Sequence, residues 1–350
     1  MAASVRKAMI LTAGLGTRLN PISQKIPKPL VPVLNIPNIL HILFLLKRAG
    51  VTDVVMNLFH LPKEMAAFFS KKNFGGLNYS FTHENPILGT GGGVKNAEAF
   101  LSDSRFILVN CDFVTNIDIK RFVDQHVEKN SKASMILIQD PSRQHLYSKV
   151  GIDQNDHLVQ LPKMEISKAH RHGIFTGIHI LEPSVFDLLE NKTCGINDVL
   201  YPALMKSFPQ SVHGFIDTKG FWYDTGDLPA FLTTSHHLLQ QLTNENQFLK
   251  DILASLDIHL VETQPKVWVD SGSSTNHVKL SGPILIGKNV TFGKNVQVGP
   301  FTVIGDNCCL EDFSCAENSV LLPNSFLSAG TRLLNSIQFE NLSLSAKSIV

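Results

Sequence analysis

The chain of 350 residues carries 31 Lys and Arg against 30 Asp and Glu, a formal net charge of +1, and 43% of its residues are hydrophobic. This balance argues against a broad electrostatic footprint for nucleic acid or an anionic membrane, and the apolar content allows one large domain and a smaller one. The five cysteines contain no CxxC pair, so free thiols in a reducing cytoplasm are expected rather than a disulfide framework or a zinc site.

No signal peptide or membrane-spanning segment is expected. Residues 1–7 lead into the first apolar run without the hydrophobic region of a signal peptide. The most apolar segment, Ile39–Leu46, is interrupted by His41 and is far too short to cross a bilayer. We therefore expect neither a membrane partner nor a nucleic acid partner.

The first half of the chain alternates between short apolar runs and amphipathic segments of helix length. This alternation predicts an α/β fold with a Rossmann-like, mostly parallel sheet and helices on both faces. Ligands of such sheets bind beyond the carboxyl ends of the strands. The expected strands are Ala8–Leu11, Asp53–Leu58, Leu77–Phe81, Phe106–Val109 and Ala133–Ile138, and the expected helices are Asn38–Ala49, Pro62–Lys71, Gly93–Leu101 and Asp118–Glu128.

From about Val150 to Gly226 the expected elements are shorter and indicate a substrate-facing elaboration of the same domain. A helix over Pro229–Leu242 follows, and Thr243–Pro265 is a polar connector with some helical character. The predicted organisation is a catalytic domain over 1–242, a linker over 243–265 and a second domain over 266–350. The short elements expected are strands at Val150–Asp153, His157–Leu161 and Ile174–Leu181, and helices around Pro183–Leu189 and Asn197–Lys206.

After Val267 an apolar residue recurs at every sixth position. A period of six is neither helical nor a simple alternation, and it predicts a hexapeptide solenoid in which each hexad forms one flat face of a triangular coil. We expect a left-handed parallel β-helix of two to three coils; an ordinary glycine-rich β-meander is the alternative that this regular spacing disfavours. The recurring positions are Ile286, Phe292, Val298, Ile304, Leu310, Ala316 and Leu322.

The most informative motif directly follows the first expected strand. It reads Leu11-Thr12-Ala13-Gly14-Leu15-Gly16-Thr17-Arg18-Leu19, and Pro27-Lys28-Pro29-Leu30 comes soon after it. Glycines let the backbone approach a ligand, and exposed N–H groups in such a loop can cradle phosphate oxygens. Arg18 adds a planar fork and Lys28 a compact charge, both suited to phosphate. The stretch therefore predicts a polyphosphate site.

Two better-known phosphate motifs do not fit. Leu19 stands where a dinucleotide fingerprint needs its third glycine, and the Gly-Lys-Ser/Thr of a P-loop is missing. The whole string resembles the N-terminal signature of the sugar-1-phosphate nucleotidyltransferases, also called nucleoside-diphosphate-sugar pyrophosphorylases. The resemblance covers about the first 240 residues. It implies that the nucleotide is bound by Leu11, Ala13, Gly14, Leu15, Gly16 and Thr17.

Two aspartates occupy positions suited to a metal ion. Asp112 follows a buried apolar strand, and Asp224 lies in Trp222-Tyr223-Asp224-Thr225-Gly226-Asp227. Mg²⁺ is typically held by one or two carboxylates together with substrate phosphates. The alternatives are a helix or turn cap for Asp112 and a plain β-turn for Asp224. The resemblance implies Mg²⁺ bound by both, with Asp227 at most supporting them.

A second glycine loop runs through Glu84-Asn85-Pro86-Ile87-Leu88-Gly89-Thr90-Gly91-Gly92-Gly93. Its backbone can lie against a flat base and read its edge, or it can be a flexible loop that enters a helix. The resemblance implies nucleotide contacts by Glu84, Gly89, Thr90 and Gly91. The loop resembles those of mannose- and heptose-1-phosphate guanylyltransferases and, in its Thr-Gly-Gly-Gly core, of muramate-1-phosphate uridylyltransferases. The base therefore stays open.

The sugar side rests on the resemblance alone. Family members carry Glu-Lys-Pro after the strand matched here by Leu158–Leu161, whereas this chain has Pro162-Lys163-Met164-Glu165. Lys163 is therefore either the lysine that contacts the sugar phosphate or a solvated surface lysine. Further positions that the resemblance assigns to the sugar are Gly151, Thr176, Gly177 and Asn197.

Asn197 and Asp198 also allow a second interpretation. They either bind sugar hydroxyls or cap a helix that starts at Val199, which is an ordinary role for such residues.

Together these patterns predict a sugar-1-phosphate nucleotidyltransferase that converts an NTP and a sugar 1-phosphate to an NDP-sugar and pyrophosphate. Catalysis then needs positioning and charge neutralisation more than covalent help. Arg18 would hold the β,γ-phosphates, Lys28 the α-phosphate, and Asp112 with Asp224 the Mg²⁺. GTP with a mannose- or heptose-type 1-phosphate is favoured, and UTP with an amino-sugar or muramate 1-phosphate comes next.

Two other classes of function stay open. A hexapeptide acyltransferase is disfavoured because the hexads offer no histidine base. A non-catalytic regulatory subunit that binds nucleotide-sugar is disfavoured because Arg18, Lys28, Asp112 and Asp224 are all present. A short solenoid exposes strand edges and has a small core, so we expect it to pack against the catalytic domain or a second copy of itself, giving a homo-oligomer.

Overall fold

The computed structural model describes residues 4–71 and 74–346. They form two compact units, and each unit is assembled from segments that are distant in the sequence. The first, here called the sheet unit, comprises the described residues of Met1–Leu15, Ile42–Cys111 and Thr115–Trp222. The second, the coil unit, comprises those of Gly16–His41, Asp112–Val114 and Tyr223–Val350. The chain thus passes repeatedly from one unit to the other.

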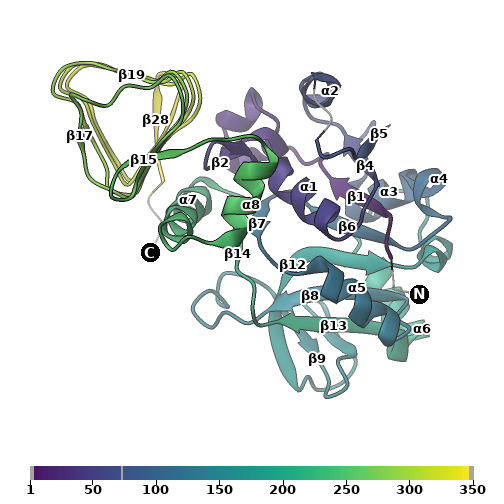
Figure 1. Ribbon diagram of the computed structural model, residues 1–350. Helices are drawn as coiled ribbons and strands as arrows, with labels where there is room; N and C mark the ends of the chain where they lie inside the picture. Colours follow the sequence, from purple (N-terminus) through teal and green to yellow (C-terminus); the bar gives the residue numbers. More distant parts are fainter. Residues whose placement is uncertain (1–3, 72–73, 347–350) are drawn as a thin grey trace. The chain divides into compact units, whose positions relative to one another are not determined.

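The sheet unit is built on one large mixed sheet (Figure 1). Its strands are β1 (Lys7–Leu11), β4 (Asp53–Leu58), β5 (Asn78–His83), β6 (Phe106–Asn110), β8 (Ala133–Ile138), β9 (Lys149–Ile152), β10 (Leu158–Leu161), β11 (Met164–Glu165), β12 (Arg171–Leu181) and β13 (Val212–Asp217). β1 pairs in parallel with β4 and β6, and β5 continues beyond β4, as the alternating pattern predicts. The long strand β12 runs antiparallel to β6, β8 and β9, so the parallel pairing of the first strands gives way to antiparallel pairing at β12.

Helices accompany these strands. They are α1 (Asn38–Arg48), α2 (Pro62–Lys71), α3 (Gly89–Asn96), α4 (Glu98–Leu101), α5 (Ile119–Glu128) and α6 (Leu200–Ser207), followed in the coil unit by α7 (Leu228–Thr243) and α8 (Gln247–Ser255). Phe106 and Leu108 of β6 lie in one buried cluster with Val94 of α3 and Tyr201 of α6. Strands buried in this way appear in a sequence as continuous apolar runs, which is why β6 was predictable.

One expected helix differs. The segment predicted as a helix over Gly93–Leu101 forms two helices, α3 and α4, and α3 begins four residues earlier at Gly89. Gly91, Gly92 and Gly93 are buried inside α3. The lack of side chains there allows close packing against neighbouring backbone, and this packing overrides the poor helix propensity of glycine.

The C-terminal part of the coil unit is a triangular coil of short parallel strands, seen end-on in Figure 1. The strands are β15 (Val261–Gln264), β16 (Val267–Val269), β17 (Lys279–Leu280), β18 (Ile284–Ile286), β19 (Thr291–Phe292), β20 (Gln297–Val298), β21 (Thr302–Ile304), β22 (Cys309–Leu310), β23 (Cys315–Glu317), β24 (Val320–Leu321), β25 (Phe326–Leu327), β26 (Arg332–Leu334), β27 (Ser336–Phe339) and β28 (Leu342–Ser345). The hexapeptide β-helix predicted from the sequence is confirmed.

The register of the coil follows the hexads and then departs from them. Ile286 pairs with Ile304, and Val298 pairs with Ala316, each one turn of the coil apart. On the next turn Ile304 pairs with Leu321 and not with the predicted Leu322, because one turn between hexads is a residue shorter. The parallel ladder also extends from β16 to β27, so the coil is longer than the two to three turns expected.

One of the three sheets of the coil carries an antiparallel strand at each of its ends. β15 pairs with β16 at the start, and β28 pairs with β27 at the end. In this sheet such partners cover the strand edges that would otherwise invite pairing with another chain. Among the residues described, no helix has both the length and the apolar character needed to cross a membrane.

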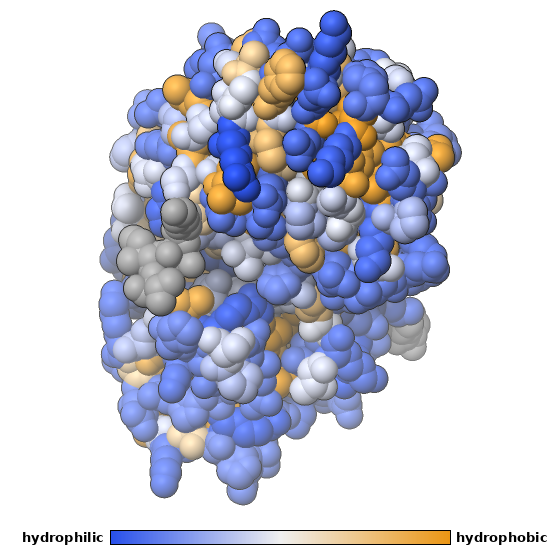
Figure 2. Space-filling model, turned by 90° about the vertical axis from the view of Figure 1, so that its left-hand side faces the viewer, coloured by the Kyte–Doolittle hydropathy of each residue, from blue (hydrophilic) through white to orange (hydrophobic). Residues whose placement is uncertain are grey.

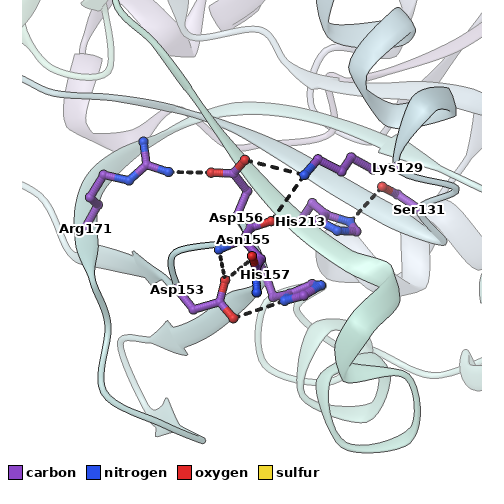
Figure 3. A network of polar contacts seen from close by, with 8 residues as sticks. All are labelled: Lys129, Ser131, Asp153, Asn155, Asp156, His157, Arg171 and His213. Atoms are coloured by element: carbon purple, nitrogen blue, oxygen red, sulfur yellow. Dashed lines mark hydrogen bonds and ion pairs between the residues drawn. The ribbon is translucent and has the colours of Figure 1, made fainter.

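A network of charged side chains fixes the turn between β9 and β10 (Figure 3). Asp156 in this turn pairs with Arg171 of β12, and its carboxylate lies 3.9 Å from Lys129 Nζ at the end of α5. Asp153 accepts a hydrogen bond from the backbone N–H of His157 and lies 3.0 Å from its ring Nδ1. The network therefore holds a hairpin of the sheet unit to α5 and β12.

His213 of β13 lies buried beside this network. Its Nδ1 is 2.8 Å from Ser131 Oγ, and its ring centre is 5.0 Å from that of His157. Burial lowers the pKa of His213 to about 4, and the nearby His157 and Lys129 act in the same direction. His213 is therefore neutral in the folded protein at pH values where an unfolded histidine is already protonated.

This difference predicts how stability depends on pH. Between about pH 4 and pH 6.5 the unfolded chain binds a proton at residue 213 that the folded chain does not, so stability falls as the pH falls. We expect the free energy of unfolding of wild type to fall by up to about 1.4 kcal/mol more per pH unit than that of His213→Gln. Urea denaturation at pH 7, 6 and 5 measures both slopes. His259→Gln, at an exposed histidine, is the control, and parallel slopes for wild type and His213→Gln would contradict the expectation.

Candidate functional site

The coil unit brings four of the sequence-predicted residues together. Lys28 Nζ donates to Asp112 Oδ2 at 2.7 Å, and both side chains are mostly buried. The charges of Asp112, Lys28 and Arg18 all influence the pKa of Asp224. These residues come from three separate segments of the chain, yet they form one group of two acidic and two basic side chains. We call Arg18, Lys28, Asp112 and Asp224 the charged group.

Local backbone structure positions the two basic side chains. Arg18 lies in a short 3-10 helix, Thr17–Leu19, and Lys28 opens another, Lys28–Leu30. Gly16 precedes the first with a φ of +64°, a conformation that residues with a side chain rarely adopt. A Cβ at Gly16 would also lie 3.2 Å from Lys28 Cβ. Gly16 thus permits both the turn and the close approach of Lys28.

Two hydrogen bonds hold Asp224, one at its side chain and one at its backbone. Its Oδ1 accepts the N–H of Gly226 at 2.8 Å, and its carbonyl oxygen accepts the hydroxyl of Thr234 in α7 at 2.6 Å. A Cβ on Gly226 would lie 2.9 Å from both Asp224 Oδ1 and Arg18 Nη2. A side chain at position 226 would therefore crowd the Asp224 carboxylate and displace the Arg18 guanidinium.

Asp227 supports this arrangement. Its Oδ1 accepts the N–H of Ala230 and caps the N-terminus of α7, and its Oδ2 lies 4.0 Å from Arg18 Nη1. The Arg18 side chain is 62% exposed, so its guanidinium is open to solvent and to a ligand.

The charged group has an electrostatic imbalance. Burial raises the pKa of Asp224, and the neighbouring Asp112 carboxylate raises it further. The Gly226 N–H and the charges of Lys28 and Arg18 oppose this rise without cancelling it. Because the single buried ammonium of Lys28 does not fully offset the repulsion between the two carboxylates, additional positive charge at this place would be favourable.

The donor set of the charged group fits a divalent cation. Asp112 and Asp224 offer hard carboxylate oxygens, and a cation held by both would offset the burial and the repulsion by Asp112 that raise the pKa of Asp224. Within the described part of the chain, no three His, Cys, Asp or Glu side chains gather in a metal-binding arrangement. A cation bound here would therefore take its remaining ligands from water or from substrate phosphates.

The sheet unit contains the other half of the first glycine loop. Leu11 ends β1, Ala13 is buried, and Gly14 and Leu15 are exposed. A Cβ on Gly14 would meet nothing within 4 Å. This stretch of backbone is therefore open, as a loop that contacts a ligand requires. Gly16 and Thr17 continue the loop in the coil unit.

Glu84 connects the two glycine loops through a residue that the sequence analysis missed. Its Oε1 accepts Asn57 Nδ2 at 2.7 Å, and its Oε2 accepts the N–H of Leu88 at 2.7 Å. Asn57 Oδ1 in turn accepts the N–H of Thr12 at 2.8 Å. Both Glu84 oxygens thus bind the protein itself. Asn57 is a buried polar residue near the end of the apolar strand β4, and this was the signal that could have identified it.

The second glycine loop packs against a segment of the protein. The N–H of Gly91 donates to the carbonyl oxygen of Cys194 at 2.9 Å, and the N–H of Ile196 donates to Thr90 Oγ1 at 2.8 Å. A Cβ on Gly89 or Gly91 would lie 2.7 Å from atoms of Cys194. At least one reason for these glycines is therefore contact with residues 192–196.

The residues assigned to the sugar are dispersed over the sheet unit. Thr176 is buried, its hydroxyl donates to the carbonyl oxygen of Ile136, and Gly177 follows with a φ of +85° against Asn110. Gly151 pairs with Gln160 across the β9–β10 hairpin. The close contact of Gly177 with Asn110 at the carboxyl end of β6 was not predicted.

Lys163 and Asp198 meet at the surface. Lys163 Nζ donates to Asp198 Oδ1 at 2.9 Å, with the two side chains 83% and 55% exposed. Asn197 is exposed, and neither it nor Asp198 caps α6, whose N-cap residue Val199 makes no side-chain bond. The capping interpretation is therefore wrong, and Lys163 and Asn197 stay candidates for contacts with a ligand.

Comparison with known families places both parts of the chain. A family described as nucleotidyl transferase matches residues 7–241, and a family described as bacterial transferase hexapeptide (six repeats) matches residues 283–315. Mannose-1-phosphate guanyltransferase 2 of Candida glabrata is 33% identical over 251 residues, covering 69% of this chain and 66% of that protein. Mannose-1-phosphate guanyltransferase of Saccharomyces cerevisiae is 34% identical over 235 residues, covering 65% and 63%. The match thus spans slightly less than two thirds of these relatives.

Solved structures give the same result. HddC from Yersinia pseudotuberculosis is similar with a TM-score of 0.56 and 25% identity, covering 67% of this chain and all of that one. A putative glucose-1-phosphate thymidylyltransferase from Bacillus anthracis has a TM-score of 0.55 at 21% identity, which speaks for the fold alone.

The raised pKa of Asp224 leads to a prediction about Asp224→Asn. Above the raised pKa the folded protein bears the cost of an ionised, repelled carboxylate, so stability is lost as the pH rises through this range. Without divalent cations at pH 8, the asparagine variant should therefore melt at a higher temperature than wild type. Its NTP-dependent turnover should fall by about 10²–10³-fold, as when a charged partner of a reacting group is removed.

Differential scanning fluorimetry in EDTA measures this effect. Asp118→Asn is the matched control, because the Asp118 carboxylate, like that of Asp224, accepts a backbone N–H, and asparagine retains this bond at the N-cap of α5. A lower melting temperature for Asp224→Asn than for wild type would show that Asp224 is not under electrostatic strain.

Proposed function

Since the chain belongs to the nucleotidyl transferase family, we propose that it transfers a nucleotidyl group from an NTP to a sugar 1-phosphate and releases pyrophosphate. The observation that carries this proposal is the charged group, in which Lys28 and Asp112 pair at 2.7 Å beside Asp224 and Arg18. Two carboxylates with two basic side chains match the needs of a reaction among phosphate groups.

In the proposed reaction a phosphate oxygen of the sugar 1-phosphate attacks the α-phosphorus of the NTP. A new P–O bond forms while the bond to the β-phosphate oxygen breaks, and pyrophosphate leaves with the electron pair. Arg18, whose side chain is exposed, binds the β- and γ-phosphates and neutralises the charge that grows on the leaving pyrophosphate. Lys28, fixed by Asp112, holds the α-phosphate and the incoming phosphate close together.

Asp112 and Asp224 are the proposed ligands of Mg²⁺, which when bound polarises the α-phosphate and offsets its charge. The two carboxylates would thus keep the cation close to Lys28, which pairs with Asp112. Gly226 supports this role, because its lack of a side chain leaves space for Arg18 near Asp224.

GTP and mannose 1-phosphate are the proposed substrates. Relatives that are about one third identical are named mannose-1-phosphate guanyltransferase, and HddC has been solved in complex with GMP-PN at 25% identity. Heptose-type sugars and the UTP-dependent reactions remain outcomes of the assay. The proposed nucleotide contacts are the open backbone of residues 11–17 and the loop from Glu84 to Gly91, and the proposed sugar contacts are Gly151, Lys163, Thr176, Gly177 and Asn197.

We also propose that the protein forms a homo-oligomer in the cytoplasm. Figure 2 shows a face that is mainly hydrophilic, with separate hydrophobic patches. Large apolar side chains of the coil are exposed, with Phe313 at 65%, Leu342 at 51% and Leu334 at 40%. Exposed apolar surface of this kind favours association between copies. Free cysteines agree with a reducing compartment.

A pyrophosphate-release assay tests the proposed reaction. The full-length protein is incubated with Mg²⁺, each of GTP, UTP, ATP, CTP and dTTP, and each of mannose, glucose, N-acetylglucosamine and heptose 1-phosphates. We expect turnover that requires both substrates and is fastest with GTP and mannose 1-phosphate. Turnover with UTP alone among the nucleotides would correct the base, and no turnover in any pair would refute the enzymatic function.

The role of Arg18 gives a further expectation. If the guanidinium stabilises charge that appears on pyrophosphate, Arg18→Ala lowers kcat and kcat/KM together, by about 10²–10³-fold. Arg18→Lys should recover little, since a point charge does not replace a bidentate fork. Arg332→Ala, at an exposed arginine of the coil, serves as control. An effect limited to the KM for the sugar phosphate would mean that Arg18 binds the other substrate.

A further inference from the structure

The coil touches two elements that adjoin the charged group. One is residues 16–41, which include Arg18 and Lys28 and which we call the basic segment. The other is α7, which begins four residues after Asp224. The basic segment, α7 and the coil belong to the same compact unit. The coil is therefore a neighbour of the site through specific contacts, each of which involves a residue outside the charged group.

The first contact is at the tip of a hairpin in the basic segment. Strands β2 (Pro32–Val33) and β3 (Ile36–Pro37) pair in antiparallel fashion around Leu34 and Asn35. Both tip residues have positive φ, as a tight two-residue hairpin turn requires. Asn35 Nδ2 donates to the carbonyl oxygen of Ile304 in the coil at 2.8 Å. The hairpin that follows Lys28 is thus tied to a coil strand.

The second contact lies on the other side of Lys28. Lys25 follows the 3-10 helix Ile22–Gln24, three residues before Lys28. Its Nζ donates to both carboxylate oxygens of Glu340, at 2.6 and 2.8 Å, and lies 5.9 Å from the ring centre of Phe339. Lys28 is therefore flanked in the sequence by two residues that the coil holds.

The third contact supports α7. Thr234 in α7 donates to the carbonyl oxygen of Asp224 at 2.6 Å. Two residues further along the helix, the ring centre of His236 lies 5.6 Å from that of Phe301 in the coil. The coil thus contacts the helix that holds the backbone of Asp224, as well as the segment that carries Lys28.

We propose that Lys25, Asn35 and Glu340 are positioning residues, through which the coil fixes Lys28 and Arg18 relative to Asp112 and Asp224. The inference rests on the proposed function, because it assigns these contacts to a reaction among phosphates. The rate of such a reaction depends steeply on position, and a displacement of about 1 Å costs about 10²-fold. The coil is then part of the catalytic apparatus without supplying a reactive group.

The contacts of Lys25 and Glu340 are too weak for their main effect to be on the stability of the fold. The Lys25–Glu340 pair is half exposed, and such pairs contribute little to the stability of a fold. The basic segment has its own core in Leu19 and Ile22, which are fully buried. Loss of the coil contacts should therefore leave the fold intact while the basic segment gains freedom.

Two substitutions remove the contacts with little strain. Asn35→Gly deletes the amide while glycine keeps the positive φ, and Glu340→Gln removes the charge while keeping the shape. Asn130→Gly is the control for the first, because Asn130 is exposed and has a φ of +48° in the sheet unit. Glu317→Gln is the control for the second, because Glu317 pairs with Arg332 within the coil.

Hydrogen exchange on the ligand-free, full-length protein gives the decisive measurement. In the double variant Asn35→Gly/Glu340→Gln, amide exchange of residues 22–34 should rise about tenfold, while exchange in α5 and the melting temperature stay at wild-type values. Neither control should change the exchange of residues 22–34. Unchanged exchange there in the double variant would overturn the proposal, whatever the enzyme assay gives.

Kinetic measurements and a charge-reversed pair test the positioning role independently. The double variant should lower kcat about tenfold, with a smaller change in the KM for the NTP. Lys25→Glu should lower kcat as well, and Lys25→Glu/Glu340→Lys should restore both kcat and hydrogen exchange. Wild-type kcat in the double variant, or no rescue by the reversed pair, would refute the positioning role. If wild type itself transfers no nucleotide, the proposed function fails, and hydrogen exchange still decides whether the coil restrains the basic segment.

Discussion

The ion pair between Lys28 and Asp112, with Asp224 close by, is the constraint on which the rest of the site depends. Two carboxylates in partly buried positions repel each other, and the ammonium of Lys28 at 2.7 Å offsets only part of that repulsion. Such an arrangement is costly for folding, and the proposed cation, held by both carboxylates together with substrate phosphates, would offset that cost. Strain of this kind is typical of functional sites.

The glycines near the charged group occupy positions where other side chains come so close that a Cβ would crowd them. Gly226 leaves space for the Arg18 guanidinium beside Asp224, and Gly16 leaves space for Lys28. In the second loop, Gly89 and Gly91 leave space for the backbone and thiol of Cys194. Glycine in these motifs thus serves the packing of the protein on itself as much as the approach of a ligand. A motif that looks like a ligand loop in sequence can have both purposes.

The fold connects the site to its surroundings by interleaving the chain. The basic segment belongs to the coil unit by its contacts, although it lies near the N-terminus. The chain passes from the sheet unit to the coil unit between residues 15 and 16, within the first glycine loop, and again between residues 111 and 112, directly before Asp112. The residues of the charged group therefore belong to the same unit as the C-terminal part of the chain, while β1 and β6, which precede Gly16 and Asp112 in the sequence, belong to the sheet unit.

The sequence by itself determined the elements whose signal is local. Buried strands such as β6 form continuous apolar runs, and the coil repeats its apolar positions every six residues, so both were predictable from periodicity. The residue types of the charged group were also recognisable, since phosphate chemistry restricts the choice. Only the tertiary structure decided that Asn57 links Glu84 to Thr12, that Leu321 replaces Leu322 in the coil register, and that Lys25 meets Glu340. Each of these depends on residues that are distant in the sequence or on a single-residue shift in a turn, and neither leaves a periodic trace in the chain.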